Sequence, residues 1–299
     1  MFSQPRAHAE PSTINSGPSP AVLRLAASAR ARSSLLSLGL EPCRGYLPRG
    51  FEPTIPGYAR FLESLIDATS DIAAAFKFNL AFFESLGSQG AGLLERIRAH
   101  VPRDSFVIAD AKRSDIGSTA EHYATALYDR LAADSATVNP LMGRDACEPF
   151  LAHADKLTFF LVLTSNPGAA DFLLPGGLFR AIASAVESWN TRGNAGAVVG
   201  ATKPEQVSEL RALMPRCPFL IPGIGAQGGD LQAVAAHGPM VAGPDGFNGL
   251  LFHVTRGVLP AADETGDPIE TIRAKALAWR DRINAAAGVP QRRTDHVAL

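Results

Sequence analysis

Four charged side chains follow an apolar run in the middle of the chain. In FVIADAKRSDIGSTA, the run Phe106–Ala109 precedes Asp110, Lys112, Arg113 and Asp115, four charges within six residues. Because side chains alternate along a strand, Asp110 and Lys112 should point to the same side of it. A carboxylate and an ammonium group held together can stabilise developing charge and transfer a proton. This stretch therefore predicts an electrostatic and acid–base centre.

A second lysine, Lys77, lies in AAAFKFN at the end of an earlier apolar run. If the two runs form neighbouring parallel strands, Lys77 should lie beside Asp110 and Lys112 at a similar height. Charges that face the interior of a barrel are costly unless they are paired or used, so these three side chains are interpreted as functional. Arg113 alone is interpreted as a solvated strand end.

The elements that would position these charges alternate between strands and helices. Between the apolar runs lie segments such as YARFLESLIDA, FRAIASAVESWN and PIETIRAKALAWRDRINAA, with apolar residues at helical spacing. The strand starts are about 31 residues apart, the length of one βα unit. The pattern predicts the α/β class and a single (β/α)8 TIM barrel, with a doubly wound open sheet as the alternative. The expected strands are Leu35–Leu40, Ile72–Phe78, Phe106–Ala109, Ala136–Asn139, Leu157–Thr164, Ala195–Val199, Pro218–Ile221 and Leu250–Val254.

The first twenty residues differ from the rest of the chain. They are rich in proline and glycine and lack apolar periodicity, so residues 1–20 are expected to form a flexible, dispensable tail and residues 21–299 the barrel domain. The next stretch, AVLRLAASARARSSLL, has arginines and no acidic residue, as a transit peptide would. Its helical spacing favours a first helix that leads into the first strand.

The composition limits the classes of partner. The chain has 299 residues, 46% of them hydrophobic, and a net charge of −1, which is typical of a globular protein with no attraction to nucleic acid or an anionic membrane. A small-molecule partner is expected. Cys43, Cys147 and Cys217 form no CxxC pair, so neither a disulfide framework nor a zinc site is indicated and a cytoplasmic location fits best. The histidines show no HExxH arrangement, and no metal is assigned.

A glycine-rich loop follows the seventh expected strand. GIGAQG, Gly223–Gly228, matches the GxGxxG pattern of dinucleotide-binding folds, but it lies far from the first strand and lacks the acidic residue that such folds place after the next strand. In a barrel, loops after strands 7 and 8 offer main-chain N–H groups to a single phosphate. Arg256, in HVTRG at the end of the eighth strand, could pair with that phosphate. Phosphate binding is therefore favoured over dinucleotide binding.

These motifs together resemble one enzyme family. DAKRSDIGSTA, AFKFNLAFFESLG, VNPLMG, LTSNPGAADF, VVGATKPE and LIPGIGAQGGD closely resemble the orotidine 5′-monophosphate decarboxylases, specifically the longer bacterial type. The resemblance implies decarboxylation of orotidine 5′-monophosphate to uridine 5′-monophosphate in pyrimidine biosynthesis, without metal or organic cofactor, by a homodimer with shared active sites. It implies a catalytic tetrad of Lys77, Asp110, Lys112 and Asp115, and substrate contacts by Glu41, Ile116, Thr119, Ser165, Gly225, Gln227 and Arg256. Asp115, Ile116 and Thr119 are expected to reach the partner subunit's site.

The chain departs from the family pattern at three places. GLEP puts Glu41 where the family has an aspartate on the ribose, HVTRG replaces the usual NSSRG, and Leu141 replaces an aromatic residue after NP. None of these changes removes a tetrad residue, so activity is expected. In that chemistry, Lys112 would stabilise the carbanion left at C6 and donate the proton. A metal-dependent keto-sugar-phosphate lyase or synthase and a non-catalytic nucleotide-binding relative are the alternatives.

Overall fold

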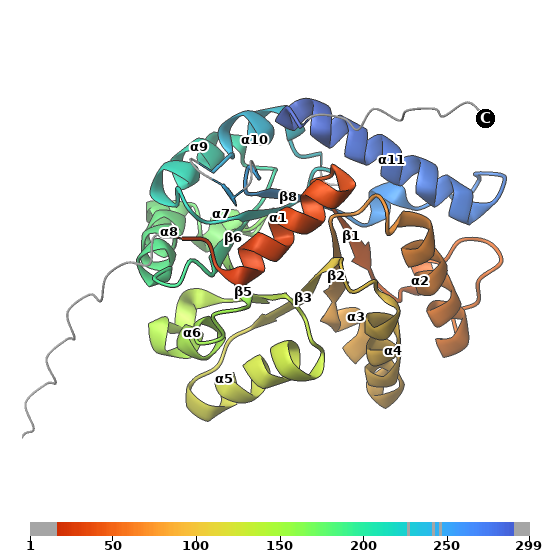
Figure 1. Ribbon diagram of the computed structural model, residues 1–299, viewed down its shortest axis with the longest axis horizontal. Coiled ribbons are helices and arrows are strands. Elements are labelled where there is room, and N and C mark those ends of the chain that lie inside the picture. The colour runs from red at the N-terminus through yellow and green to blue at the C-terminus, as the bar shows by residue number, and fades with distance from the viewer. Residues whose placement is uncertain (1–16, 226–227, 241–242, 245–246, 290–299) are drawn as a thin grey trace, which may run out of the picture.

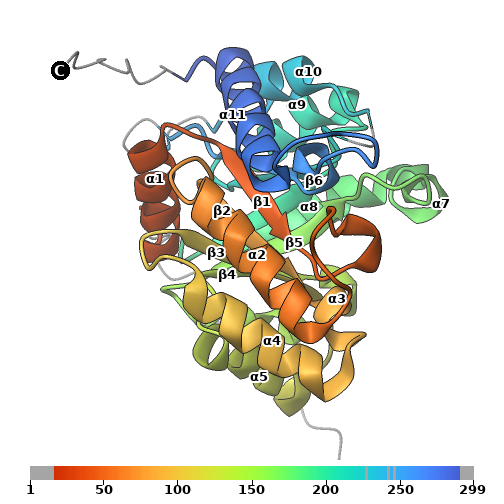
Figure 2. The same ribbon diagram turned by 90° about the vertical axis from the view of Figure 1, so that its right-hand side faces the viewer.

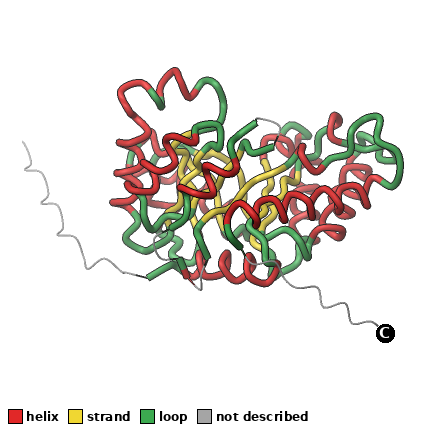
Figure 3. Tube along the Cα trace, turned by 90° about the horizontal axis from the view of Figure 1, so that it is seen from above, coloured by secondary structure: helices red, strands yellow, loops and turns green. Residues whose placement is uncertain are grey.

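The computed structural model describes residues 17–225, 228–240, 243–244 and 247–289. Within these residues eight parallel strands close into one barrel, in which each strand pairs with its neighbours in the chain and β8 pairs with β1. Figure 3 shows the strands inside a layer of helices. The predicted single (β/α)8 barrel is confirmed. The strands are β1 (Leu36–Leu40), β2 (Ala75–Asn79), β3 (Phe106–Arg113), β4 (Ser135–Val138), β5 (Leu157–Leu163), β6 (Ala195–Val199), β7 (Phe219–Pro222) and β8 (Leu250–Val254).

Most of the helices cover the outside of the barrel and bury an apolar face. In the second helix, Phe61, Leu62, Leu65 and Ile66 are buried at helical spacing. No helix in the described part of the chain is long and apolar enough to cross a membrane. The helices are α1 (Pro20–Arg32), α2 (Ile55–Thr69), α3 (Leu80–Glu84), α4 (Gly87–His100), α5 (Gly117–Ala124), α6 (Arg144–Leu151), α7 (Ala169–Phe172), α8 (Leu178–Trp189), α9 (Pro204–Leu213), α10 (Leu231–His237) and α11 (Pro268–Ala287).

Strand β3 is longer than the apolar run that predicted it. It continues past Ala109 to Arg113, so Asp110 and Lys112 belong to the strand and not to a following loop. Its register with β4 shifts between Ala109 and Arg113. Such irregularities at the rim of a barrel redirect side chains. Apolar periodicity ends at the first charge and therefore could not show where the strand itself ends.

Strand β2 carries different side chains on its two faces. On β2, Phe76 and Phe78 are fully buried in the apolar core, while the alternate residues Lys77 and Asn79 line a pocket. This alternation follows from the pleat of a strand, which sends successive side chains to opposite faces. Asn79 is the last residue of β2, so this pocket lies at the carboxyl end of the strand, as is usual for enzymes with this fold.

Helix α1 covers the opposite, amino-terminal end of the barrel. Arg32 donates hydrogen bonds to the main-chain oxygens of Ser70 and Asp104, just before β2 and β3, and Arg24 pairs with Asp134 before β4. In Figure 1, α1 lies across the centre of the molecule, and Figure 2 shows it on the side opposite α7. The predicted first helix is confirmed, and its arginines tie it to the turns that start three strands.

The start of α1 includes the end of the expected tail. Pro20 is the first residue of the helix, and the Ser19 side chain accepts a hydrogen bond from the main-chain N–H of Val22. Ser19 also donates its main-chain N–H to the carbonyl of Gly193. Ser19 and Pro20 are therefore part of the folded barrel, while residues 1–16 lie outside the described residues.

Replacing the helix cap should lower stability without affecting the carboxyl-terminal face of the barrel. Ser19→Ala removes the acceptor for one of the first N–H groups of α1, so the free energy of unfolding should fall by about 1 kcal/mol. Urea titration followed by circular dichroism measures the change. Ser188→Ala, an exposed serine inside α8, is the matched control and should cause no loss, because alanine is the better helix former. Equal losses in the two variants would contradict the capping role.

Candidate active site

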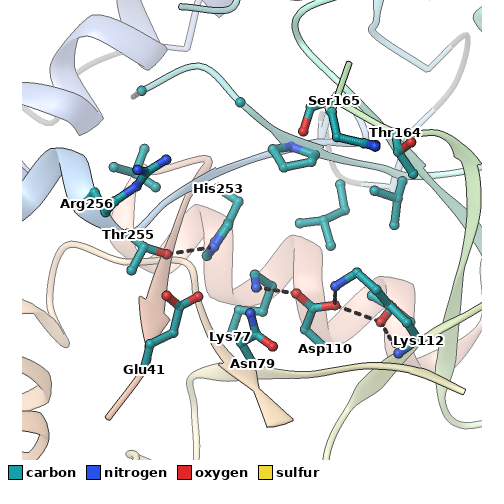
Figure 4. A pocket seen from close by; sticks show the side chains of 18 of the residues that line it. Glu41, Lys77, Asn79, Asp110, Lys112, Thr164, Ser165, His253, Thr255 and Arg256 are labelled. Atoms are coloured by element: carbon teal, nitrogen blue, oxygen red, sulfur yellow. Dashed lines mark hydrogen bonds and ion pairs between the residues drawn. The ribbon is translucent and has the colours of Figure 1, made fainter. Parts of the chain in front are cut away.

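A pocket of about 590 Å³ opens at the carboxyl ends of the strands. Most strands contribute to its wall, as Figure 4 shows for the labelled residues. The pocket brings together seven residues that the sequence singled out, although they are far apart in the chain. Its lining includes Glu41 after β1, Lys77 and Asn79 on β2, Asp110 and Lys112 on β3, Thr137 on β4, Thr164 and Ser165 after β5, Gly223 and Gly225 after β7, and His253, Thr255 and Arg256 at β8.

The centre of the pocket is a carboxylate held between two ammonium groups. Asp110 Oδ2 lies 2.5 Å from Lys77 Nζ, and Asp110 Oδ1 lies 2.5 Å from Lys112 Nζ. The register of β2 and β3 places Asn79 opposite Asp110 and so brings Lys77 to the adjacent position on the same face. Lys77 and Asp110 are buried, while half of the Lys112 side chain is exposed to the pocket. Lys112 is thus the member of this group that a ligand can reach.

The two lysines control the ionisation of Asp110. Burial alone would raise the pKa of this carboxyl, but Lys77 and Lys112 outweigh that effect and hold the pKa well below its usual value. Asp110 is therefore a carboxylate at neutral pH. Because its pKa is lower in the folded protein, the pairing adds stability above the unfolded-state pKa, and this stability is lost as the pH falls through the folded-state pKa.

Glu41 forms the wall of the pocket at the end of β1. It is buried, and this burial raises the pKa of its carboxyl, although Lys77 and a hydrogen bond from Asn79 act in the opposite direction. In Figure 4 the Glu41 carboxylate is seen on the side of Lys77 away from Asp110. The side chain is therefore a polar acceptor placed next to the cationic centre.

His253 connects the first and last strands inside the barrel. Its Nδ1 lies 3.3 Å from Ser37 Oγ, and its Nε2 lies 3.1 Å from Thr255 Oγ1. Burial, reinforced by the nearby Lys77 ammonium, holds the pKa of the imidazole well below its usual value, so the ring is neutral. Thr255 packs against Gly39, where an added Cβ would lie 2.1 Å from Thr255 Oγ1. Glycine at position 39 leaves the room that the Thr255 side chain needs.

Arg256 lies at the far end of the pocket, next to the glycine-rich loop. Gly223, with a φ of +100°, and Gly225 line the pocket on the β7 side. The residue after the arginine, Gly257, is held by Trp279 of α11, whose Nε1 donates to the Gly257 carbonyl at 3.1 Å. A guanidinium beside a glycine-rich turn is a suitable arrangement for a phosphate dianion.

Three of the described residues that the sequence predicted for the site do not line this pocket. Asp115 accepts the main-chain N–H of Ile116 at 2.8 Å in the segment after β3, and it does not line the pocket. Ile116 is 55% exposed, and Thr119 is exposed at the start of α5. Gln227 lies outside the described residues. A single chain therefore assembles three of the four charges expected for the tetrad.

Sequence analysis missed several polar residues of the pocket, among them Asn79, Thr137, His253 and Thr255. Asn79 could have been found by strand alternation, since it lies two residues after Lys77 on the same face. Thr137 and His253 lie within apolar runs that carry no separate chemical signal. Arg113, interpreted as a solvated strand end, lies outside the pocket, where it pairs with Glu84.

The described residues contain no cluster of three or more His, Cys, Asp or Glu side chains that could hold a metal ion. The pocket contains two lysine ammonium groups around the Asp110 carboxylate, and Arg256 and a glycine-rich loop lie at its other end. Such an arrangement can bind an anionic group at one end and stabilise negative charge that develops at the other.

Comparison with known proteins agrees with this geometry. Residues 53–267 match the family described as "Orotidine 5'-phosphate decarboxylase / HUMPS family". The chain is 42% identical to an orotidine 5′-phosphate decarboxylase from an Azoarcus species, over 87% of this chain and 97% of that protein. It is similar to the structure of Leishmania donovani OMP decarboxylase, with a TM-score of 0.76 and 36% identity over 90% of this chain and 99% of that one. It also matches L. donovani UMP synthase, with a TM-score of 0.77 and 39% identity, over 88% of this chain and 56% of that longer chain.

Removing Lys77 should leave the Asp110 charge buried with only one cation. Lys77→Met keeps much of the side-chain volume, so the free energy of unfolding should fall by about 3–5 kcal/mol at neutral pH. The difference from the wild type should narrow as the pH falls, because Asp110 of the variant can take up a proton and lose its buried charge at a pH where two lysines still keep the wild-type carboxyl ionised. Guanidinium titrations at neutral and acid pH measure both effects.

Arg96→Met is the matched control for that variant. Arg96 forms an ion pair with Glu63 on the exposed surface of α4, where solvent screens the charges. It should therefore change stability little at either pH. If Lys77→Met were as stable as Arg96→Met, the conclusion that Lys77 compensates the buried charge of Asp110 would be wrong.

Proposed function

The chain belongs to the Orotidine 5'-phosphate decarboxylase / HUMPS family, and we infer from this that it converts orotidine 5′-monophosphate to uridine 5′-monophosphate and CO2. This is the last step of pyrimidine nucleotide synthesis from small precursors. The observation that carries the inference is the Asp110 carboxylate between Lys77 and Lys112, in a pocket whose other end holds Arg256. The cluster fits a reaction that needs fixed charges.

The reaction leaves an electron pair that the substrate cannot delocalise. The bond between C6 and the carboxylate carbon breaks, CO2 departs, and the pair stays on C6 in the plane of the ring. The Lys112 ammonium stabilises this charge and gives its proton to C6, forming the new C–H bond. Because half of the Lys112 side chain is exposed to the pocket, the neutral amine can regain a proton from water once product leaves.

Asp110 and Lys77 prepare Lys112 for this role. The carboxylate keeps Lys112 charged and directs its Nζ, while Lys77 keeps Asp110 ionised. A substrate carboxylate next to Asp110 is also repelled in the ground state, which could add to the rate. We rank this repulsion second, since stabilisation of the carbanion acts on the transition state directly.

The remaining pocket residues are proposed to bind the rest of the nucleotide. Arg256, Gly225 and Gln227 would bind the phosphate, Ser165 the pyrimidine and Glu41 the ribose. The positions of Arg256 and Gly225 in one pocket with Lys112 support this assignment. Phosphate binding far from C6 can then contribute to the chemical step by holding the base against Lys112.

We propose a homodimer in which Asp115, Ile116 and Thr119 complete the partner subunit's site. Asp115 lies outside its own pocket, so a second chain is needed to supply the fourth charge. Ile116, Leu141 and Met142 are exposed apolar side chains in the segments after β3 and β4, on the same rim of the barrel. Exposed apolar side chains gathered in this way are typical of an interface.

We further propose that the enzyme works in the cytoplasm without a metal or organic cofactor. Cys43, Cys147 and Cys217 are all unpaired, as is usual in a reducing compartment. The alternative of a metal-dependent keto-sugar-phosphate enzyme differs in a simple way, since a chelator would stop it.

Purified protein should consume orotidine 5′-monophosphate in the presence of EDTA, followed by the loss of substrate absorbance. Lys112→Ala should lower kcat by at least about a thousandfold, because it removes both the cation and the proton donor. Its affinity for uridine 5′-monophosphate, measured by calorimetry, should change less than about threefold, since the lysine acts in the transition state. No activity of the wild type would overturn the function, and parallel losses of binding and turnover would overturn the role of Lys112.

The shared site can be tested by mixing two inactive variants. Lys112→Ala and Asp115→Ala are unfolded together and refolded at equal amounts. If Asp115 acts in the partner's site, each mixed dimer has one site with both substitutions and one with neither. Random pairing makes half of the dimers mixed, so roughly a quarter of wild-type activity should return.

The control for this mixing is the same protocol with tagged and untagged Lys112→Ala, which should give no activity. Mixed dimers are counted by capture on the tag. Abundant mixed dimers of the two variants without activity would show that Asp115 serves its own chain.

A further inference from the structure

One hydroxyl group on β4 contacts both halves of the charged strand β3. Thr137 Oγ1 lies 3.0 Å from the main-chain nitrogen of Lys112 and 2.9 Å from Asp110 Oδ1. Thr137 is 1% exposed and belongs to the lining of the pocket. It is therefore close enough to the charged centre to act on it and too buried for bulk solvent to replace it.

The direction of these two hydrogen bonds is fixed by chemistry. A main-chain N–H can only donate, so the Thr137 oxygen accepts from Lys112. The Asp110 carboxylate can only accept, so the Thr137 proton points to Asp110 Oδ1. Oδ1 thus receives two donors, from Thr137 and Lys112 Nζ, while Oδ2 receives Lys77. The three donors together fix the orientation of the carboxylate.

The hydrogen bond to Lys112 lies at the irregular part of β3. Ala109 pairs with Ala136 and Arg113 pairs with Val138, so three residues of β3 face the single residue Thr137 on β4. In such a bulge the extra residues lose their regular ladder partners. The side chain of Thr137 supplies the acceptor that the Lys112 N–H would otherwise lack.

Lys112 also has an unusual backbone conformation. Its φ is +49°, in the left-handed region that residues other than glycine rarely adopt. Such a conformation persists only where surrounding contacts hold it, and it is often found at functional sites. The bulge directs both Asp110 and Lys112 into the pocket. The Thr137 hydroxyl accepts a hydrogen bond from the main-chain N–H of Lys112, the residue with the strained backbone.

We infer that Thr137 is a positioning residue for the decarboxylation. Its hydroxyl holds the bulge of β3 so that the Lys112 ammonium reaches C6, and it keeps the Asp110 carboxylate turned toward both lysines. The inference rests on the proposed function, since it assumes that Lys112 acts on the substrate. Thr137 itself need not touch the nucleotide.

Two substitutions separate the hydroxyl from the shape of the side chain. Thr137→Val keeps the volume but removes the donor and the acceptor, so kcat for orotidine 5′-monophosphate should fall about 10- to 100-fold. KM and the affinity for uridine 5′-monophosphate should stay within about threefold of wild type. Thr137→Ser restores the hydroxyl and should recover kcat to within about fivefold.

Thr158→Val is the matched control. Thr158 is a buried strand threonine on β5 whose hydroxyl contacts Tyr128 at 3.0 Å and not the charged centre. It should lower the melting temperature and leave kcat unchanged. This control shows what the loss of a buried threonine hydroxyl does to activity through stability alone.

Each outcome has one meaning. A kcat of Thr137→Val equal to the wild type, or lowered no more than that of Thr158→Val, overturns the inference, as does a Thr137→Ser variant as slow as the valine variant. If Thr137→Val does not fold, the serine and a Thr137→Ala variant are compared in its place, and equal kcat values overturn the inference. An inactive wild type would instead refute the proposed function, so the two failures are distinguishable.

Discussion

A buried carboxylate without neighbouring cations would destabilise the fold, and the mouth of this barrel is organised around that constraint. Asp110 can remain ionised because Lys77 on the adjacent strand and Lys112 two residues later each donate to one of its oxygens. Lys77 is buried with Asp110, which leaves Lys112 as the cation that faces the open pocket. The same arrangement that makes the charge tolerable therefore also presents a directed ammonium group to a substrate.

The two ends of the barrel differ in what they carry. Helix α1 lies across the amino-terminal end, where Arg24 and Arg32 bind the turns that lead into β2, β3 and β4. The carboxyl ends of the strands are free of this task and carry the polar side chains. The bulge in β3 is part of this division, since it gives up regular pairing with β4 at the point where Asp110 and Lys112 turn into the pocket.

Much of the fold and the centre of the site could be predicted from the sequence. Each of the eight strands overlaps the apolar run that predicted it, because strands buried on both faces are marked by β-prone apolar residues. Lys77, Asp110 and Lys112 were found because charge at the end of such a run is unusual. The bulge and Thr137 could not be predicted, since they depend on the register between two strands. Asp115 lies after the end of β3 and outside the pocket of its own chain, which periodicity does not show.

The contact between Gly39 and Thr255 has a consequence for the order in which this chain can accept substitutions. A side chain at position 39 would occupy the space of the Thr255 hydroxyl. The two positions can therefore be substituted only in one order. Position 255 must first become smaller before position 39 can acquire a Cβ, and the reverse order passes through a clash inside the barrel. The substitutions that position 39 on β1 can accept thus depend on the residue at position 255, which faces it from the end of the neighbouring strand β8.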